Sequence, residues 1–284
     1  MREETGTGAE KSQSGRTRGM DAFVKEQDFA LLRADRISFS VLDSILRGPC
    51  VLLRSDHRRL ILCHSTPPYP VWIWTADGLG AEEKEYAWRL AEELCPLSDG
   101  YRLMLKYELA DFFVGKAKEA GLNAGISKEL LSYDCPTPIK PTHRAGGGLQ
   151  PCQAGELTEA AALLTRFYAE VGEHPLPKQT VLEKTAQKIA EEALFFWKDP
   201  AGRTAACGGW RHSEGMATIT DVYTLPEFRR RHCAQNLVYE LTRRAKEAGF
   251  LPVLYTNANY PASNACYQKI GYRLRGRLCT VSLL

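Results

Sequence analysis

The sequence has no long apolar run. Its longest runs, such as residues 51–53 and 60–63, fall far short of the roughly eighteen apolar residues that a membrane helix requires. The N-terminal segment is polar and lacks the apolar core of a secretory signal. We therefore expect a flexible extension over residues 1–19 and no membrane partner.

Charge of one sign and paired cysteines are also scarce. The 37 basic and 34 acidic side chains leave a formal net charge of +3, which is too small for the broad positive field of a dedicated nucleic-acid binder. The nine cysteines show no CxxC spacing, a pattern typical of reduced thiols rather than of a disulfide framework or a zinc site. These absences predict a cytoplasmic protein with no nucleic-acid partner and no metal.

What is present is the composition of an ordinary globular protein, with 44% hydrophobic and 25% charged residues. At 284 residues the chain is long enough for two domains. Its composition changes most sharply at residues 135–148, which contain three prolines and three consecutive glycines and are typical of a linker. We therefore predict an N-terminal α/β domain over residues 20–134 and a second domain over residues 149–284.

Hydrophobic periodicity and turn residues predict the elements of both domains. In the first we expect the helix 28–46, the strands 50–54, 60–64 and 71–75, the helix 82–94, the strand 101–106 and the helix 109–120. In the second we expect the strand 148–153, the helices 156–171 and 181–192, the strands 194–197, 204–210 and 216–224, the helix 232–248, the strand 253–256, the helix 264–270 and the strand 278–283. A right-handed strand–helix–strand unit beside antiparallel strands makes the predicted sheet mixed.

Two segments of the second domain carry recognisable motifs. Residues 222–234 read VYTLPEFRRRHCA, and residues 254–272 read LYTNANYPASNACYQKIGY. They resemble GNAT superfamily N-acetyltransferases of the FR47-like branch, in which VYT-x-P-x-x-R-G-x-G-x-A is followed by LYT and then by P-x-S-N-x-x-Y-x-K-x-G-Y. The second block is the more specific one, and the resemblance covers about half of the chain.

The resemblance implies both fold and activity. It implies a GNAT fold, with a mixed, mostly antiparallel sheet flanked by helices. It also implies transfer of an acetyl group from acetyl-CoA to a primary amine of a small molecule or peptide, by direct attack in a ternary complex. Related two-domain enzymes include glycine N-acyltransferase-like proteins, which suggests an acyl-CoA donor and a small amine acceptor.

A loop that leads directly into a helix presents unpaired backbone N–H groups at the positive end of the helix dipole, where a pyrophosphate fits. In the family this loop matches residues 229–234, here called the phosphate arm. The arm consists of Arg229, Arg230, Arg231, His232, Cys233 and Ala234. Arg230 and His232 replace the two family glycines, so we expect their side chains to crowd the phosphates or to reshape the loop.

The resemblance assigns further roles around the thioester. The pantetheine of CoA would lie along Val222, Tyr223 and Thr224, with the N–H of Val222 or Tyr223 stabilising the oxyanion. Tyr267 matches the acid that protonates the departing CoA thiolate. Asn264, one turn earlier on the same helix, would contact the pantetheine.

The general base stays unassigned. Many relatives have a glutamate where this sequence has Thr218. The substitutes are Asp221, Glu214 and His212, or a chain of water molecules. Strand alternation places Asp221 on the opposite face from Thr218 unless a bulge intervenes.

Several alternatives remain open at this stage. The missing glycines and the missing carboxylate also fit a non-catalytic acyl-CoA-binding or regulatory protein, and a basic nucleic-acid-binding module is a third hypothesis. The N-terminal domain is interpreted as a degenerate copy of the second, because its order of strands and helices is similar. The sequence leaves open the acceptor, the acyl chain length and the oligomeric state, with a homodimer as one option.

Overall fold

The structure, a computed structural model, describes residues 25–172 and 175–284, so the predicted extension over residues 1–19 lies outside the described residues. The first half of the chain forms α1 (Lys25–Leu31), α2 (Ser40–Ile45), β1 (Leu52–Ser55), β2 (Leu60–His64), β3 (Val71–Thr75), α3 (Ala81–Leu94), β4 (Leu103–Leu105), α4 (Tyr107–Glu119) and β5 (Ala124–Asp134). The second half forms β6 (Gly148–Pro151), α5 (Leu157–Glu170), α6 (Lys178–Ala190), β7 (Leu194–Lys198), β8 (Thr204–Ser213), β9 (Met216–Thr224), α7 (Cys233–Glu247), β10 (Leu251–Asn257), α8 (Pro261–Lys269) and β11 (Arg273–Leu283).

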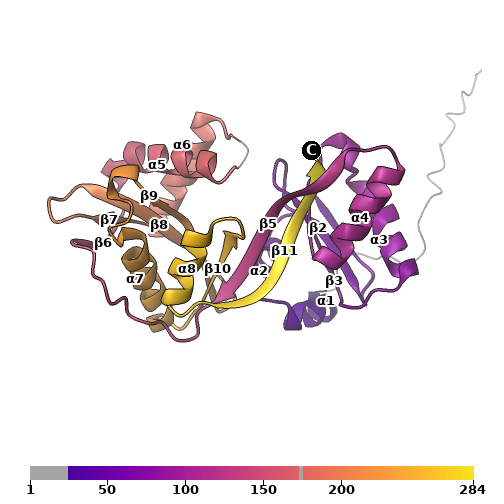
Figure 1. Cartoon of the computed structure of the whole chain (residues 1–284), viewed down its shortest axis with the longest axis horizontal. Helices are drawn as coiled ribbons and strands as arrows, with labels where there is room; N and C mark the ends of the chain where they lie inside the picture. Colours follow the sequence, from indigo (N-terminus) through magenta and orange to yellow (C-terminus); the bar gives the residue numbers. More distant parts are fainter. Residues whose placement is uncertain (1–24, 173–174) are drawn as a thin grey trace, which may run out of the picture.

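All strands belong to one continuous eleven-stranded sheet (Figure 1). Its order is β1-β2-β3-β4-β11-β5-β10-β9-β8-β7-β6. The pairs β3–β4 and β9–β10 are parallel and the other neighbours are antiparallel. The predicted fold class, a mixed and mostly antiparallel sheet flanked by helices, is confirmed.

The two halves exchange their last strands at the centre of the sheet. β5 closes the first half in chain order but pairs with β10 of the second half, and β11 pairs with β4 of the first half. The two exchanged strands also pair with each other along their length. Cys279 and Val281 of β11 are therefore buried in the core of the first half, and Leu131 and Tyr133 of β5 in that of the second.

The same topology occurs twice. In each half, three antiparallel strands lead through a helix to a parallel strand, and a second helix then leads to the exchanged strand. The helices α3 and α7 thus occupy equivalent positions, as do α4 and α8. This shared strand order agrees with the interpretation of the N-terminal region as a copy of the second, whereas the domain boundaries at residues 134 and 149 stay a prediction.

Each half also contacts a hairpin turn of the other half. Arg36 Nη2 donates to the carbonyl oxygen of Glu214 at 2.7 Å, and Arg47 forms an ion pair with the Glu214 carboxylate at 3.3 Å, in the β8–β9 turn. Reciprocally, Lys184 of α6 binds the hydroxyl of Tyr69 in the β2–β3 turn. These two equivalent contacts fix the helices of one half against the strands of the other.

The predicted helix over residues 28–46 is wrong in its middle. The structure has α1 and α2 with turns between them, because Asp35 and Ser38 serve tertiary contacts instead of a helix ladder. Asp35 accepts from the Trp74 indole at 2.9 Å and from Lys106 at 2.6 Å. The carbonyl oxygen of Ser38 accepts from the buried Tyr255 hydroxyl at 2.8 Å.

The sequence pattern did not predict β5, and it predicted too short a strand for β11. The structure begins β11 at Arg273 rather than at residue 278. In β5, Lys128 and Glu129 interrupt the apolar pattern, and the strand is recognised only by its neighbours on both sides.

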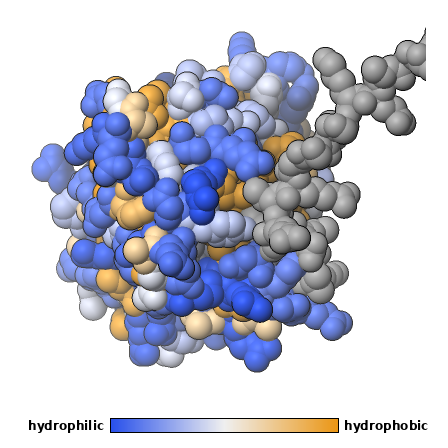
Figure 2. Space-filling model, turned by 90° about the vertical axis from the view of Figure 1, so that its right-hand side faces the viewer, coloured by the Kyte–Doolittle hydropathy of each residue, from blue (hydrophilic) through white to orange (hydrophobic). Residues whose placement is uncertain are grey.

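Figure 2 shows the side of the molecule on the right of Figure 1, where hydrophilic residues dominate and hydrophobic ones form small patches. In the described part of the chain, no helix has the length and hydropathy of a membrane span.

Candidate functional site

The parallel strands β9 and β10 separate before they end. Their pairing runs from Met216 opposite Leu251 to Ile219 opposite Leu254, whereas β9 continues to Thr224. Beyond Ile219, the edge of β9 on the β10 side has no strand partner among the described residues. Such an edge offers backbone donors and acceptors to an extended ligand.

A β-bulge distorts β9 at this position. Tyr223 pairs with Cys207 and Thr220 with Gly209, so Asp221 and Val222 together oppose one residue of β8. Asp221 has a φ of 57°, in the left-handed region. The bulge therefore allows the side chain of Asp221 to lie on the same face of the sheet as that of Thr218.

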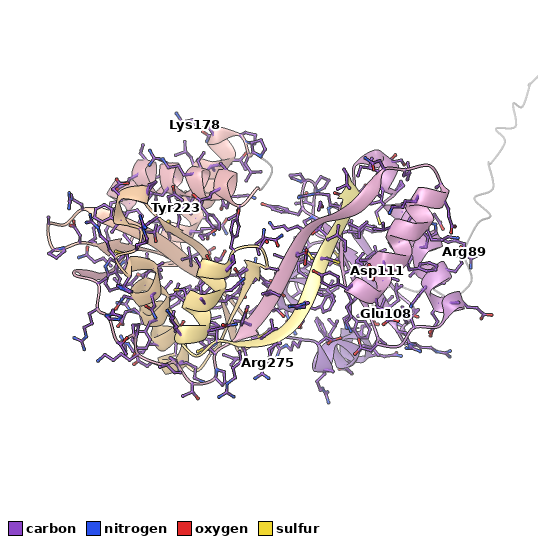
Figure 3. All side chains as sticks on the ribbon, viewed as in Figure 1. Arg89, Glu108, Asp111, Lys178, Tyr223 and Arg275 are labelled. Atoms are coloured by element: carbon purple, nitrogen blue, oxygen red, sulfur yellow. The ribbon has the colours of Figure 1, made fainter. Side chains whose placement is uncertain are left out.

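The bulge sorts the side chains of β9 onto the two faces of the sheet. Ile219 and Val222 both belong to the core formed with α7, although they are three positions apart. Tyr223 packs into the core formed with α5, on the side that α5 and α6 cover (Figure 3). We call this side of β9 the acceptor face, and Asp221 lies on it, beside Tyr168 of α5 and Lys188 of α6.

The phosphate arm keeps the backbone shape of a glycine loop without glycines. Arg230 has a φ of 59° and His232 a φ of 62°, and these are the two positions where the family has glycine. Residues with a Cβ atom adopt this region at a cost of roughly 1–2 kcal/mol, although histidine is enriched there. At both positions the arm thus adopts the φ region that glycine favours, and its fit to the phosphates stays a prediction.

The arm leads directly into α7. Cys233 is buried and Ala234 is half-buried in the first turn of the helix. No side chain of the described residues caps this N-terminus, so its first N–H groups remain available to a ligand. The dipole of a helix of this length favours an anion at that end.

Arg229 is already engaged by the protein. Its guanidinium binds the Glu170 carboxylate at 2.6 Å and donates to the carbonyl oxygen of Thr224 at 3.2 Å. It also lies 5.7 Å from the centre of the Tyr223 ring. The hydrogen bond to Glu170 raises the pKa of Arg229, so a phosphate at this arginine would have to compete with a carboxylate.

The other arm side chains differ in their contacts. Arg231 lies over the Phe228 ring at 5.6 Å, and the His232 ring stacks on that of His143 at 4.8 Å. Arg230 is exposed. The structure thus brings all three arginines to the start of α7, where all three are exposed.

Two buried oxygens near the splayed strands have no hydrogen-bond partner within the described residues. They are Thr224 Oγ1, at the end of β9, and Asn264 Oδ1, on α8. The amide nitrogen of Asn264 donates to the carbonyl oxygens of Asn257 and Ala258, each at 3.3 Å, which holds the side chain against the end of β10. Because burying an unpaired polar group is costly, these atoms fit a ligand that carries its own polar groups, such as the amides of pantetheine.

Tyr267 lies one turn after Asn264 on α8. Its ring packs edge-on against Tyr272, with centroids 6.0 Å apart. Burial raises the pKa of Tyr267 above its ordinary value, and the neighbouring Cys266 adds to the shift. Its hydroxyl makes no hydrogen bond with any described residue, so it is a protonated donor without a partner.

Of the candidate bases, Glu214 and His212 lie away from the splayed end of β9. Glu214 sits in the β8–β9 turn and binds Arg47. His212 stacks on Phe250 at 4.3 Å, and burial lowers the pKa of His212. Asp221 is the candidate base that lies in the bulge, at the splayed end of β9.

Sequence reasoning missed the side chains that surround Asp221. Lys188 and Tyr168 come from two helices whose contact with the bulge depends on tertiary packing. No motif in either helix marks them, and the ion pair between Glu170 and Arg229 has no local signal either.

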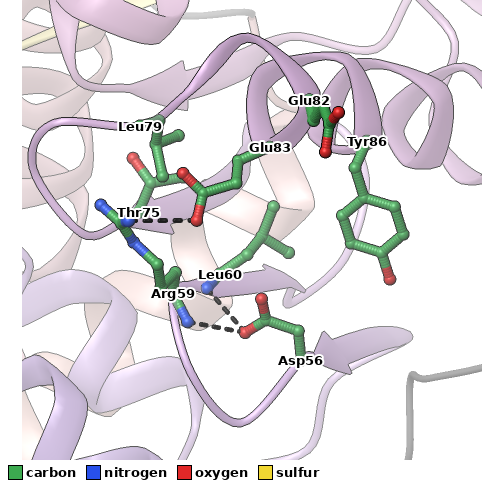
Figure 4. A pocket seen from close by; sticks show the side chains of 8 residues that line it. All are labelled: Asp56, Arg59, Leu60, Thr75, Leu79, Glu82, Glu83 and Tyr86. Atoms are coloured by element: carbon green, nitrogen blue, oxygen red, sulfur yellow. Dashed lines mark hydrogen bonds and ion pairs between the residues drawn. The ribbon is translucent and has the colours of Figure 1, made fainter.

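The first half offers a counterpart of the arm at the end of β3. A hollow of about 180 Å³ lies there, lined by Asp56, Arg59, Leu60, Thr75, Leu79, Glu82, Glu83 and Tyr86 (Figure 4). Glu83 accepts the N–H of Gly80 at 2.7 Å at the start of α3 and pairs with Arg59 at 3.0 Å. At the start of α3 a carboxylate therefore occupies the position that is equivalent to the open N–H groups of α7. This end of α3 is unsuited to binding a phosphate.

The left-handed arm positions give a testable consequence for stability. We expect His232→Gly to be about 1 kcal/mol more stable than His232→Ala, because alanine keeps the Cβ atom that opposes a φ of 62°. Urea unfolding of the two variants measures the difference.

Ala234→Gly, two residues further along and inside α7, is the matched control. There glycine should destabilise the protein, by up to about 1 kcal/mol. Equal stability of the two His232 variants would contradict a left-handed backbone at this residue.

Comparisons with known proteins agree with this geometry. The sequence model of the FR47-like protein family matches residues 200–281. The search among curated proteins found no match.

Solved structures resemble the chain over nearly its whole length. A GCN5-related N-acetyltransferase from Sphaerobacter thermophilus is 11% identical with a TM-score of 0.64, covering 92% of this chain and 94% of that one. A Drosophila protein is 12% identical with a TM-score of 0.64, covering 94% and 98%. A GNAT-family acetyltransferase from Colwellia psychrerythraea is 14% identical with a TM-score of 0.55, covering 93% and 99%. The shared fold therefore includes both halves.

Proposed function

We propose that this chain is an N-acetyltransferase, because residues 200–281 match the FR47-like protein family model and the chain shares its fold with a GNAT-family acetyltransferase. It would move an acetyl group from acetyl-CoA to a primary amine of a small molecule or peptide. The observation that carries the proposal is the opening between β9 and β10, bordered by two buried oxygens without partners, Thr224 Oγ1 and Asn264 Oδ1.

The donor would lie along the unpaired edge of β9. Its pyrophosphate would bind the open N–H groups at the start of α7, with Arg230 adding positive charge. Its pantetheine would pair with residues 222–224, where Thr224 Oγ1 and Asn264 Oδ1 accept from its amide and hydroxyl groups.

The chemistry would be direct transfer. The acceptor nitrogen attacks the thioester carbon, and the carbonyl oxygen becomes an oxyanion that the N–H of Val222 or Tyr223 stabilises. The carbon–sulfur bond then breaks, and Tyr267 gives its proton to the departing thiolate. Because burial raises the pKa of Tyr267, the hydroxyl carries this proton throughout the neutral pH range.

A non-catalytic acyl-CoA-binding protein is the second candidate. It is favoured by Thr218, which replaces the family glutamate, and by the ion pair between Arg229 and Glu170. Such a protein would bind the donor and release no CoA with any amine.

Calorimetric titration with acetyl-CoA, with CoA and ATP as comparisons, tests the donor site. We expect saturable binding with a dissociation constant of about 1 μM–1 mM, the range usual for enzyme substrates. Arg229→Ala should raise this constant by up to about tenfold, the value of one charge-assisted phosphate contact less its competition with Glu170.

Arg243→Ala is the matched control, because Arg243 lies on α7 but pairs with Glu240 and Glu247. It should leave the dissociation constant unchanged. No binding at millimolar acetyl-CoA would reject the donor site, and binding without thiol release across a panel of amines would favour the second candidate.

A further inference from the structure

The carboxylate of Asp221 is the buried charged group closest in sequence to the proposed oxyanion site. Its residue is 4% exposed and lies in the bulge, one position before Val222. Lys188 Nζ binds its Oδ2 atom. The lysine side chain is 27% exposed and that of Asp221 4%, so the ion pair joins a partly exposed cation to a buried carboxylate.

The other groups that face Asp221 are neutral at neutral pH. Burial raises the pKa of Tyr168 on α5, and the charge of Asp221 adds to that shift. Burial likewise raises the pKa of Cys207 on β8, whose Sγ lies 3.5 Å from the carbonyl oxygen of Asp221. Lys188 is thus the cation that the structure places against the Asp221 carboxylate on the acceptor face.

A purely structural role accounts poorly for this arrangement. A buried ion pair loses much of its Coulombic gain to desolvation, and an apolar pair of similar size is often as stable. Asp221 also adopts a left-handed φ of 57°, a region that aspartate and asparagine tolerate better than most residues but that still costs conformational free energy. Both costs fall on one residue at the point where β9 loses its partner.

We propose that Asp221 is the general base that takes a proton from the acceptor amine, an inference that rests on the proposed acetyltransferase function. The amine nitrogen gives its electron pair to the thioester carbon, and its proton passes to the Asp221 carboxylate. The carbon–sulfur electrons leave with the thiolate, which Tyr267 protonates. Asp221 thereby takes the role of the family glutamate, whose position Thr218 occupies in this chain. It can do so because the bulge turns the Asp221 side chain to the acceptor face.

Lys188 is a positioning residue in this scheme. It acts through Asp221 by placing a positive charge beside the carboxylate and by fixing its Oδ2 atom. Lys184 lies one turn earlier on α6 but binds the Tyr69 hydroxyl and stands 4.8 Å from that ring. The two lysines therefore share a helix and a side-chain type, but only one contacts Asp221.

The test is the pH–rate profile of three variants with saturating acetyl-CoA and the best amine of the panel. Asp221→Asn should lower kcat by about 10²–10⁴-fold and should leave the dissociation constant of acetyl-CoA unchanged. It should also remove the acidic limb of the profile, which is the fall in rate at low pH. Asparagine tolerates a left-handed φ, so the backbone should persist.

Lys188→Met should keep activity at high pH but move the acidic limb to higher pH, because loss of the cation favours the protonated carboxyl group. Lys184→Met should leave the limb in place. A base is active only when deprotonated, so activity is lost as the pH falls through this limb.

Wild-type kcat in Asp221→Asn would overturn the assignment while leaving the acetyltransferase function intact. If Asp221→Asn fails to fold, an unmoved acidic limb in Lys188→Met overturns it instead. A wild-type protein that binds acetyl-CoA but acetylates no amine rejects the enzyme function, and the base with it.

Discussion

A chain that begins at residue 149 will not fold into a stable monomer. It retains the whole predicted second domain but lacks β5 and β4, so β10 loses one neighbour and β11 loses both. Leu254, Tyr272 and Leu278 then lose covering side chains from the first half. These lost pairings and contacts weigh against a net stability of only roughly 5–15 kcal/mol for a typical domain. Circular dichroism and size-exclusion chromatography measure the result.

Residues 20–284 provide the control for this truncation. That chain keeps every described strand and should unfold cooperatively at the temperature of the full protein. Co-expression of residues 20–134 with residues 149–284 should restore a folded complex, because the exchanged strands then come from two polypeptides. A monomeric, cooperatively folded protein from residues 149–284 alone would show that the strand exchange is dispensable.

Tyr267→Phe should lower kcat by about 10²–10⁴-fold when chemistry limits turnover, the usual contribution of a positioned general acid. The ring contact with Tyr272 does not involve the hydroxyl, so binding of acetyl-CoA and the melting temperature should stay close to those of the wild type. Steady-state kinetics at saturating substrates, with calorimetry for the donor, separates the two effects.

Tyr272→Phe is the matched control with the opposite expectation. Its hydroxyl is buried and hydrogen-bonded to Thr242 at 2.7 Å, so its removal should cost about 1 kcal/mol of stability and leave kcat unchanged. Equal turnover of Tyr267→Phe and wild type would remove Tyr267 as the acid and leave a water molecule to protonate the thiolate.

Local patterns in the sequence predict most elements of the second half, because each combines regular hydrophobic spacing with a clear turn or glycine at its end. β7, β8, β9, α7 and β10 all lie close to their predicted ranges. The predictions fail where structure depends on distant residues. β5 is a strand because β10 and β11 flank it, and no window of sequence around Lys128 contains that information.

The candidate site likewise combines residues that the motif predicts with contacts that depend on tertiary packing. The motif places Tyr267 and Asn264 on one helix and Val222 to Thr224 on one strand, and the structure has them there. The engagement of Arg229 by Glu170 and of Asp221 by Lys188 depends on α5 and α6 packing against β9. Backbone conformation is also invisible in the motif, since the loss of two glycines did not remove the positive φ values at Arg230 and His232.

The exchange of β5 and β11 has a consequence for the origin of the chain. A polypeptide with one such repeat could complete its sheet with the last strand of a second molecule, and its stable form would then be a two-fold symmetric homodimer. Fusion of two copies would make that partnership permanent and free one copy from selection for donor binding. The carboxylate of Glu83 at the start of α3 is the kind of change that such freedom permits, and the duplicated architecture is left with one proposed donor site, at the start of α7.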